Sequence, residues 1–279
     1  MRYGFRKSVD VFFTFCCALA LAFVFLMIAS LLWTLFKNGL PALFHLSFYT
    51  QLTPPPGMEG GLANAIVGSL IITLIAIVIA TPIGIITATY LSEFARAKRL
   101  GKIIRFANDV LLSAPSIVIG LFCYVLFVRP FHHFSALSAS IALALIALPI
   151  IVRTAEDMLE IVPQTLRESA LALGAPYWKM LLKIVFKSVY HGIFTGVLLA
   201  IARILGETAP LLFTSLSNQF WSVSLTKPMA SLPIVIFEYA MSPYPDWQHL
   251  AWGGALLITL MVCALSIVAK FILKNEGDR

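Results

Sequence analysis

Two opposite charges stand inside an apolar stretch of the chain. Arg203 and Glu207 are four positions apart, about one helical turn, within a segment at about 190–214. An unpaired charge at membrane depth costs at least about 2.5–3.5 kcal/mol on insertion scales, so such side chains normally face a bundle interior or a watery cavity. The pair is therefore the first candidate for chemistry in this sequence.

The neighbours of the two charges predict which way the pair faces. At 100° per residue, the same narrow helical stripe contains Gly192, Gly196, Ala200 and Pro210. Small residues permit close helix approach. We therefore expect this face, with both charges, to lie in the packed core of the protein rather than toward lipid.

Two interpretations of the charges stay open. They form either an ion pair that fixes helix packing or part of a solute pathway. In a pathway, the planar guanidinium of Arg203 would meet an anion, while Glu207 would compensate its charge or exchange partners as the bundle rearranges. Ser113 and Ser116, on either side of Pro115, are further pathway candidates. Their hydroxyls are equally suited to hydrogen bonds that pack helices.

Other reactive residue types give no comparable pattern. The four cysteines lie in apolar stretches without metal-ligand or redox spacing, and we interpret them as small buried hydrophobic residues: Cys16, Cys17, Cys123 and Cys263. Only two of the five histidines, His132 and His133, are adjacent, and adjacent helix residues do not share a face. We expect no catalytic residues, no metal site and no cofactor bound by this chain.

The composition indicates which kind of protein must position these residues. The 279 residues are 60% hydrophobic and 12% charged, against about 45–50% and about 25% in soluble domains. A core of this size cannot hide so much apolar surface, so lipid must cover part of it. The distribution of the net charge of +7 favours the inner face of a membrane over nucleic acid.

Six segments are apolar and long enough, or nearly so, to cross a bilayer. They cover about 11–36, 64–91, 107–128, 135–153, 190–214 and 251–273. Pro115 and Pro149 predict kinks in the third and fourth. The first is too long for a signal-peptide core and is expected to be retained. We predict an all-α polytopic membrane protein, with a short N-terminus (1–10) and one transmembrane domain (11–279).

The basic residues predict the orientation. The N-terminus, the 92–106 loop, the 153–189 segment and the C-terminus hold three, five, five and three of the 20 Lys and Arg. The opposite connections hold one each: Lys37, Arg129 and Lys227. This asymmetry places both termini in the cytoplasm.

Within the long outer connection (about 215–250), the apolar segment 232–240 is too short to span. It is interfacial or re-entrant, or it caps the outer mouth of a pathway.

The cytoplasmic segment at about 155–189 has a pattern of its own. A helix-favouring stretch places Leu166, Ala170 and Leu173 on one face and stops at Gly174. A second amphipathic run, 177–189, carries lysines four positions apart, as suits an anionic leaflet: Lys179, Lys183 and Lys187. Two short helices at the membrane surface are either a packing device or a docking knob.

A resemblance favours docking. The stretch ESALALGAPYWKMLLKIVF, residues 168–186, resembles the EAA loop of bacterial ABC-importer permeases. Glu168, Ala170 and Gly174 match that pattern, and Ser169 replaces its first alanine. The resemblance implies a type I ABC-importer permease fold. It also implies that these four residues and Leu173 form a coupling helix that docks on an ATP-binding subunit.

A narrower resemblance covers about residues 60–275. The segments that look like the PstA-type phosphate permease family are 64–70, 90–96, 108–122, 202–214 and 242–252. The most specific is GETAPLL, beside the intramembrane arginine. The resemblance implies a permease subunit that translocates inorganic phosphate across the bacterial inner membrane by alternating access.

The same resemblance implies the partners. They are a second homologous permease, two ATP-binding subunits, a periplasmic phosphate-binding protein and the lipid bilayer, with no nucleic acid. Because the sequence has no GxxxxGK[ST] loop, ATP and Mg²⁺ are expected on the separate subunits. Residue chemistry alone does not separate phosphate from sulfate or another oxyanion. An ion-coupled carrier, in which Glu207 titrates, is a weaker alternative because no inverted repeat is evident. A membrane enzyme or a scaffold is weaker still.

Overall fold

The computed structural model describes residues 2–96 and 98–277, and this part of the chain folds into helices without strands. The α-helices are α1 (Arg2–Leu43), α2 (Ser47–Thr50), α3 (Ala63–Thr89), α4 (Arg99–Ser113), α5 (Ser116–Cys123), α6 (Ala136–Ile161), α7 (Gln164–Ala172), α8 (Tyr177–Met180), α9 (Phe186–Leu205), α10 (Ala209–Thr214), α11 (Leu232–Ala240) and α12 (Pro245–Gly277). Three π-helical turns continue some of them: η1 (Tyr90–Phe94), η2 (Tyr124–Val128) and η3 (Leu181–Val185).

The expected all-α polytopic architecture is confirmed. Five helical stretches of the described chain are long and apolar enough to cross a membrane: Val9–Leu43, Ala63–Phe94, Ala136–Ile161, Tyr177–Leu205 and Pro245–Ile272. A sixth crossing results if the bent pair formed by Arg99–Ser113 and Ser116–Val128 counts as one span. The fourth predicted segment is longer than expected, since α6 continues to Ile161.

The third predicted span is two helices rather than one kinked helix. α4 and α5 meet at an angle of 104°. Ala114 and Pro115 between them are extended, with ψ angles of 133° and 132°. Proline lacks a backbone donor and drives the preceding residue out of the helical region. The bend therefore lies where Pro115 predicted it, but it is sharper than a kink.

The fifth predicted span was wrong at both ends. The helical path begins at Tyr177 and passes through η3 into α9, which ends at Leu205. The run at 177–189 is thus the start of a span, not a separate surface helix. At the other end Gly206–Thr208 interrupt the helix before α10. A glycine followed by Pro210 in the first turn of the next helix accounts for this break.

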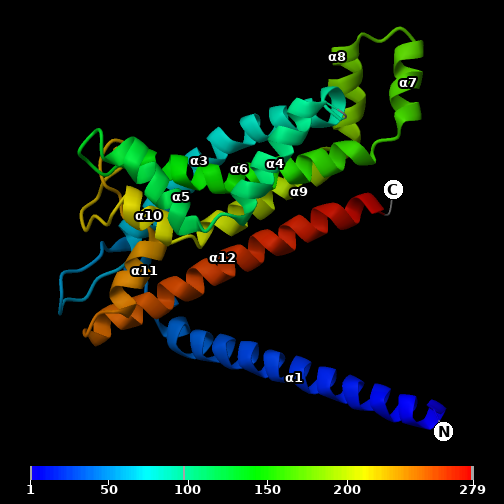
Figure 1. Ribbon diagram of the computed structural model, residues 1–279. Coiled ribbons are helices and arrows are strands. Elements are labelled where there is room, and N and C mark those ends of the chain that lie inside the picture. Colours follow the sequence, from blue (N-terminus) through cyan, green and yellow to red (C-terminus); the bar gives the residue numbers. More distant parts are fainter. Residues whose placement is uncertain (1, 97, 278–279) are drawn as a thin grey trace.

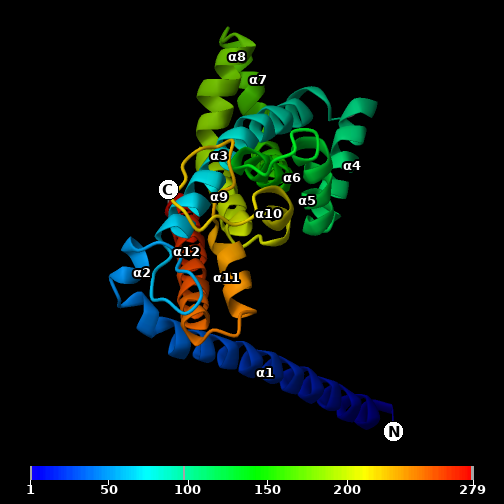
Figure 2. The same cartoon turned by 90° about the vertical axis from the view of Figure 1, so that its left-hand side faces the viewer.

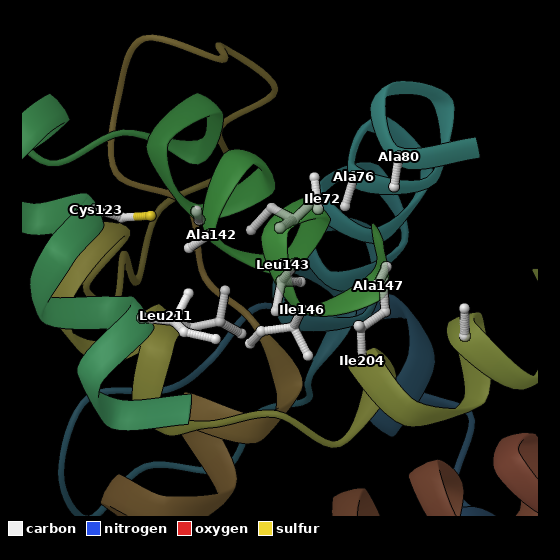
Figure 3. Packing of buried hydrophobic residues seen from close by; sticks show 14 of the residues in the cluster. Ile72, Ala76, Ala80, Cys123, Ala142, Leu143, Ile146, Ala147, Ile204 and Leu211 are labelled. Atoms are coloured by element: carbon white, nitrogen blue, oxygen red, sulfur yellow. The ribbon is translucent and has the colours of Figure 1, made fainter. Parts of the chain in front are cut away.

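α6 is the central helix of the bundle. It packs against α3, α9, α10, α4 and α5, and its small side chains form the middle of the main core (Figure 3). Its neighbours approach closely at glycines. A Cβ at Gly84 of α3 would lie 2.7 Å from Ile151, and one at Gly196 of α9 would overlap the Thr154 hydroxyl. Close packing through small residues, expected for α9, therefore holds the centre of the bundle.

α1 leaves the bundle along most of its length (Figures 1 and 2). α1 packs on α12 near the C-terminal end of α1, where Gly39 approaches the Trp252 carbonyl.

The exposure of the long helices corrects the interpretation of the cysteines as buried residues. Cys123 is buried, whereas the others are exposed on the long helices: Cys16, Cys17 and Cys263. All four are free thiols. An apolar helix surface in a membrane can face lipid, so apolar side chains need no burial within the chain.

The short apolar segment of the outer connection is part of the protein interior. It forms α11, which packs on α12 and α3. Leu232, Ile234 and Tyr239 are buried, and the Tyr239 ring stacks on Trp247 with centroids 4.3 Å apart. Ser69 of α3 accepts a hydrogen bond from the Leu232 amide at 2.7 Å. α11 is therefore fixed within the bundle rather than lying free on the membrane surface.

Candidate functional site

The charges predicted in the fifth span lie at a helix break. Arg203 is in the last turn of α9, and Glu207 is within the interruption before α10. The Arg203 Nη2 and Glu207 Oε1 atoms are 3.2 Å apart. The Glu207 amide donates to the Ile204 carbonyl at 3.2 Å, which closes the last turn. The helical path of this span starts at 177, so the pair stands at its end rather than at its middle.

The expected burial was wrong for Arg203, whereas Glu207 is mostly buried. The Arg203 side chain is 61% exposed in the isolated chain, whereas the Glu207 side chain is 13% exposed. Ala200 and Pro210, on the same predicted stripe, are buried. The helix interruption after Leu205 changes the direction of the chain, so a stripe drawn for one continuous helix does not place Glu207. The arginine reaches out of the packed core.

An exposed arginine beside apolar helices constrains what surrounds this surface. Contact with lipid at membrane depth is costly for a guanidinium, so protein or water should face it. A cation in the last turn of a helix also interacts favourably with the helix dipole. Interrupted helices in transporters supply backbone and side-chain groups to solute sites. The break thus places an exposed cation beside a carboxylate at the C-terminal end of a helix.

The two serine candidates lie at the other interruption of the bundle. α10, which follows the Arg203–Glu207 break, packs on α5, and Gly120 lies against Pro210. Ser116 opens α5 and is half-buried, while Ser113 ends α4 and is exposed. The Ser113 hydroxyl donates to the Val110 carbonyl of its own helix at 3.0 Å. Packing thus joins the helices beyond the two breaks.

A second exposed ion pair lies on α6. Arg153 Nε is 3.4 Å from Asp157 Oδ2, with about half of each side chain exposed. The sequence interpretation ended the fourth span at 153 and so assigned these residues to the cytoplasmic segment. The extension of α6 to Ile161 includes both in a helix of membrane-spanning length. The missed signal was the absence of any helix-breaking residue between Pro149 and Pro163.

The hairpin predicted for coupling projects from one end of the molecule, with α7 and α8 side by side (Figures 1 and 2). Glu168 and Ser169 are exposed on α7, and Leu173 is 89% exposed. Gly174 has a φ of +79°, the left-handed conformation expected of a helix stop. Ala170 instead is buried against the bundle. The single apolar face expected for the hairpin is therefore divided between its root and its tip.

The root of the hairpin contains a buried ionic network that the sequence interpretation missed. Arg167 Nη2 is 2.8 Å from Glu93 Oε1, with only 5% and 6% of the two side chains exposed. Arg167 also donates to the carbonyls of Leu159, at 2.8 Å, and Val162. The Tyr177 hydroxyl donates to Glu93 Oε2 at 2.9 Å. Glu93 lies 74 positions before Arg167, so local spacing gave no signal of this contact.

A second buried contact lies beside the first. Arg105 of α4 bonds Glu156 of α6 through Nε and Oε1 at 2.6 Å. Arg105 Nη2 also donates to the Leu91 carbonyl in η1 at 3.2 Å. The turn η1 therefore receives an arginine from α4 as well as one from α7.

Together these features define a class of protein. The described chain combines at least five membrane-length helices, two helix interruptions packed together and a projecting two-helix hairpin. Within the described ranges, no group of three His, Cys, Asp or Glu side chains is placed to hold a metal ion. This is the architecture of a polytopic membrane permease.

Comparison with known proteins gives the family. Residues 80–275 match the family model of binding-protein-dependent transport system inner membrane components. The chain is 54% identical over 249 residues to the phosphate transport system permease protein PstA of Yersinia pestis, covering 88% of this chain and 84% of that protein. The Pasteurella multocida protein of the same name is 52% identical, covering 93% and 92%. A more distant relative, PstA 1 of Mycobacterium tuberculosis, is 36% identical, covering 87% and 81%.

The chain therefore belongs to the family of binding-protein-dependent transport system inner membrane components. It is a multi-pass inner-membrane component of a transport system rather than an enzyme. Among solved structures, it resembles a chain of the MetNI methionine ABC transporter in an inward-facing conformation. The TM-score is 0.58 with 15% identity, covering 76% of this chain and 92% of that one. At this identity the likeness shows the fold, which is that of an ABC-importer permease.

Proposed function

We propose that this chain is the permease subunit that translocates inorganic phosphate in an ATP-driven importer. The observation that carries the proposal is the identity of 51–54% over most of the chain to proteins named phosphate transport system permease protein PstA. The exposed arginine at the helix break agrees with an anionic substrate. Its planar fork of donors matches the oxygens of a tetrahedral oxyanion.

In this proposal the solute passes along the exposed face of the Arg203–Glu207 break. A second homologous permease covers that face, which keeps the guanidinium away from lipid. Glu207 holds Arg203 in place when the site is empty, and an arriving phosphate competes for the same donors. Ser113 and Ser116 are secondary candidates for contact with the solute.

The exposed tip of the hairpin is the proposed docking element. Glu168 and Ser169 are exposed along α7, Leu173 and Gly174 are exposed at the tip, and the buried Ala170 anchors the helix to the bundle. Leu173 is one of several exposed large apolar side chains on the hairpin, with Leu171 and Trp178, and a group of such side chains is typical of a surface that meets a partner. The partner is an ATP-binding subunit, which supplies the ATP and Mg²⁺ sites. Two such subunits and a periplasmic phosphate-binding protein complete the importer.

The proposed orientation places both termini and the hairpin in the cytoplasm. The start of α1 and the end of α12 point toward the same end of the molecule as α7 (Figure 1). The basic residues Lys179, Lys183 and Lys187 are exposed near that end, as the positive-inside tendency requires. In the transport cycle, closure of the ATP-binding subunits moves the hairpin and switches the bundle from inward-facing to outward-facing.

The alternatives are less well supported. A sulfate-like oxyanion fits the same guanidinium, so the choice of phosphate depends on the relatives rather than on the charge. An ion-coupled carrier requires no docking hairpin and disagrees with the family. Neither alternative has an observation of its own in its favour.

The test is uptake of radiolabelled phosphate by cells that lack their own phosphate importer and express all partner subunits. Wild type should restore uptake, and Arg203→Gln should lower it by about a hundredfold at equal membrane abundance, because a charged multidentate contact is lost. Arg129→Gln is the matched control, since Arg129 is an exposed arginine that follows η2 and is not part of the Arg203–Glu207 break.

Three outcomes are informative. Loss of uptake in Arg203→Gln but not in the Arg129→Gln control supports both the function and the pathway. Equal uptake by wild type and Arg203→Gln would leave the arginine a packing residue. Uptake of sulfate without phosphate would retain the permease and reject the substrate.

A further inference from the structure

The buried network at the hairpin root joins segments that are far apart in the sequence. Glu93 ends the second span, Arg167 lies on α7, and Tyr177 begins the helical path into α9. The two carbonyls that Arg167 contacts close the C-terminal end of α6. A single guanidinium therefore connects the hairpin to the cytoplasmic ends of two different spans.

The geometry of this contact is that of a rigid joint. Arg167 uses Nε and Nη2 for Glu93 Oε1, at 3.1 and 2.8 Å, and Nη1 and Nη2 for backbone carbonyls. The second carboxylate oxygen of Glu93 accepts the Tyr177 hydroxyl. Such a multidentate and nearly water-free arrangement leaves the side chain few alternative conformations.

Apolar packing surrounds the joint. One buried cluster collects side chains from the ends of the same segments: Ala88, Ala155, Leu159, Val162, Ala170, Met180, Val185, Val189 and Ile193. The hairpin tip has no such packing, since Leu173 is almost fully exposed and nothing lies within 4 Å of a Cβ placed on Gly174. A force applied at the tip therefore reaches the bundle through the root.

We propose that Glu93, Arg167 and Tyr177 form a clamp that makes the cytoplasmic end of α3 move with the coupling hairpin as one body. The proposal rests on the proposed function, because the hairpin must be the element that the ATP-binding subunit moves. These three residues are positioning residues and do not touch the solute.

The second buried contact extends the same body. Arg105 ties α4 to Glu156 of α6 and to the Leu91 carbonyl of η1. α4 leads directly to the bend at Pro115 and to α5, which packs on α10 beside the Arg203–Glu207 break. The clamp thus connects the hairpin to the helices that carry the candidate pathway.

The first measurement compares transport with ATP hydrolysis in the complete complex reconstituted into liposomes. Glu93→Gln and Arg167→Lys should lower phosphate uptake per ATP hydrolysed by about fivefold or more, with ATP hydrolysis itself changed less than about twofold. Tyr177→Phe removes one hydrogen bond from a partly exposed ring, retains the ion pair and should give a smaller loss in the same direction. Glu160→Gln is the matched control, because Glu160 is exposed on α6 near the joint; its ratio should equal that of wild type.

The second measurement does not depend on the substrate. In a variant without native cysteines, spin labels at Ile86→Cys on α3 and Thr165→Cys on α7 report the distance between the two segments. Both positions are exposed. With the clamp intact, this distance should stay constant when nucleotide binds. In Glu93→Gln it should change or broaden by about 2 Å or more.

The outcomes separate the clamp from the proposed function. A wild-type complex that hydrolyses ATP without taking up phosphate contradicts the substrate, and the spin-label distances still test the clamp. The clamp is rejected if uptake per ATP is unchanged in these variants, or if nucleotide changes the distance in the wild type. Where Glu93→Gln or Arg167→Lys does not accumulate in the membrane, Tyr177→Phe provides both measurements.

Discussion

Two of the arginine–glutamate pairs described above lie in opposite environments. At the hairpin root, Arg167 and Glu93 are almost completely buried and bonded through several atoms. At the helix break, Arg203 is largely exposed and meets Glu207 through a single contact of 3.2 Å. The Arg167–Glu93 pair therefore has a fixed geometry, whereas the guanidinium of Arg203 has further N–H donors besides the one that contacts Glu207.

The difference follows from where each pair lies in the chain. Arg167 lies within reach of the free carbonyls at the end of α6, which need donors once they are buried. Arg203 lies in the last turn of α9, which ends at Leu205, and its guanidinium points away from the core. A buried pair such as Arg167–Glu93 is suited to transmit movement, because its geometry is fixed. An exposed arginine such as Arg203 is suited to exchange its carboxylate partner for a solute anion. The two pairs should therefore respond differently to the same kind of substitution.

The largest difference is expected in stability. Arg167→Gln leaves the Glu93 carboxylate buried without its cation and should lower the free energy of unfolding by about 3–5 kcal/mol. Arg203→Gln removes a cation that is 61% exposed from a carboxylate that is 13% exposed, and should lower the free energy of unfolding by less, about 1 kcal/mol. Unfolding in mixed micelles measures both. Similar values for the two variants would contradict the contrast between the pairs.

Exchange of the two charges at the break gives the next largest effect. In the double variant Arg203→Glu with Glu207→Arg, the ion pair can form again. A negative charge then stands at the exposed position that an oxyanion approaches in the proposed pathway. We expect uptake to stay about a hundredfold below wild type, because a repulsive charge replaces a charge-assisted donor. The measurement is labelled uptake at equal membrane abundance.

The same exchange separates the two interpretations left open by the sequence. A pair that only packs helices should recover with its charges reversed. Recovery of uptake to within about twofold of wild type would make Arg203 a packing residue. It would also leave the buried pair as the only one of the two with an argued part in transport.

Much of this architecture is encoded in local patterns. Apolar length predicted the spans, Pro115 predicted a bend, and Gly174 predicted the helix stop. Local patterns failed where contacts between segments far apart in the sequence determine the structure. The partner of Arg167 lies 74 positions away. The position of Glu207 depends on the helix break at 206–208, which a calculation for one continuous helix leaves out. The short apolar segment that forms α11 is buried because α3 and α12 are placed around it, which no window of sequence reveals.

A third and smaller effect is expected at the hairpin tip. Gly174 has a φ of +79°, and a Cβ there would meet nothing within 4 Å. Gly174→Ala should therefore cost about 1 kcal/mol through backbone strain alone. Because the strain lies in the proposed docking element, uptake per ATP should also fall by about threefold.

Gly57 provides the matched control for this strain. It has a φ of +78° and equally open surroundings, but it lies in the loop between α2 and α3. Gly57→Ala should cost the same free energy of unfolding and leave uptake per ATP unchanged. Equal losses of coupling in the two variants would show that strain anywhere in the chain impairs transport, and the tip would lose its special role.

The smallest effects are expected at the two serines of the α4–α5 bend. The Ser113 hydroxyl already donates to the Val110 carbonyl at 3.0 Å on an exposed helix end, and such local bonds contribute about 0.5 kcal/mol or little more. Ser113→Ala and Ser116→Ala should each leave phosphate uptake within about twofold of wild type. A loss of tenfold or more in either variant, at unchanged stability, would place that hydroxyl in contact with the solute. The pathway would then include the bend at Pro115 as well as the break at Gly206, and Arg203 would act with a neutral donor rather than alone.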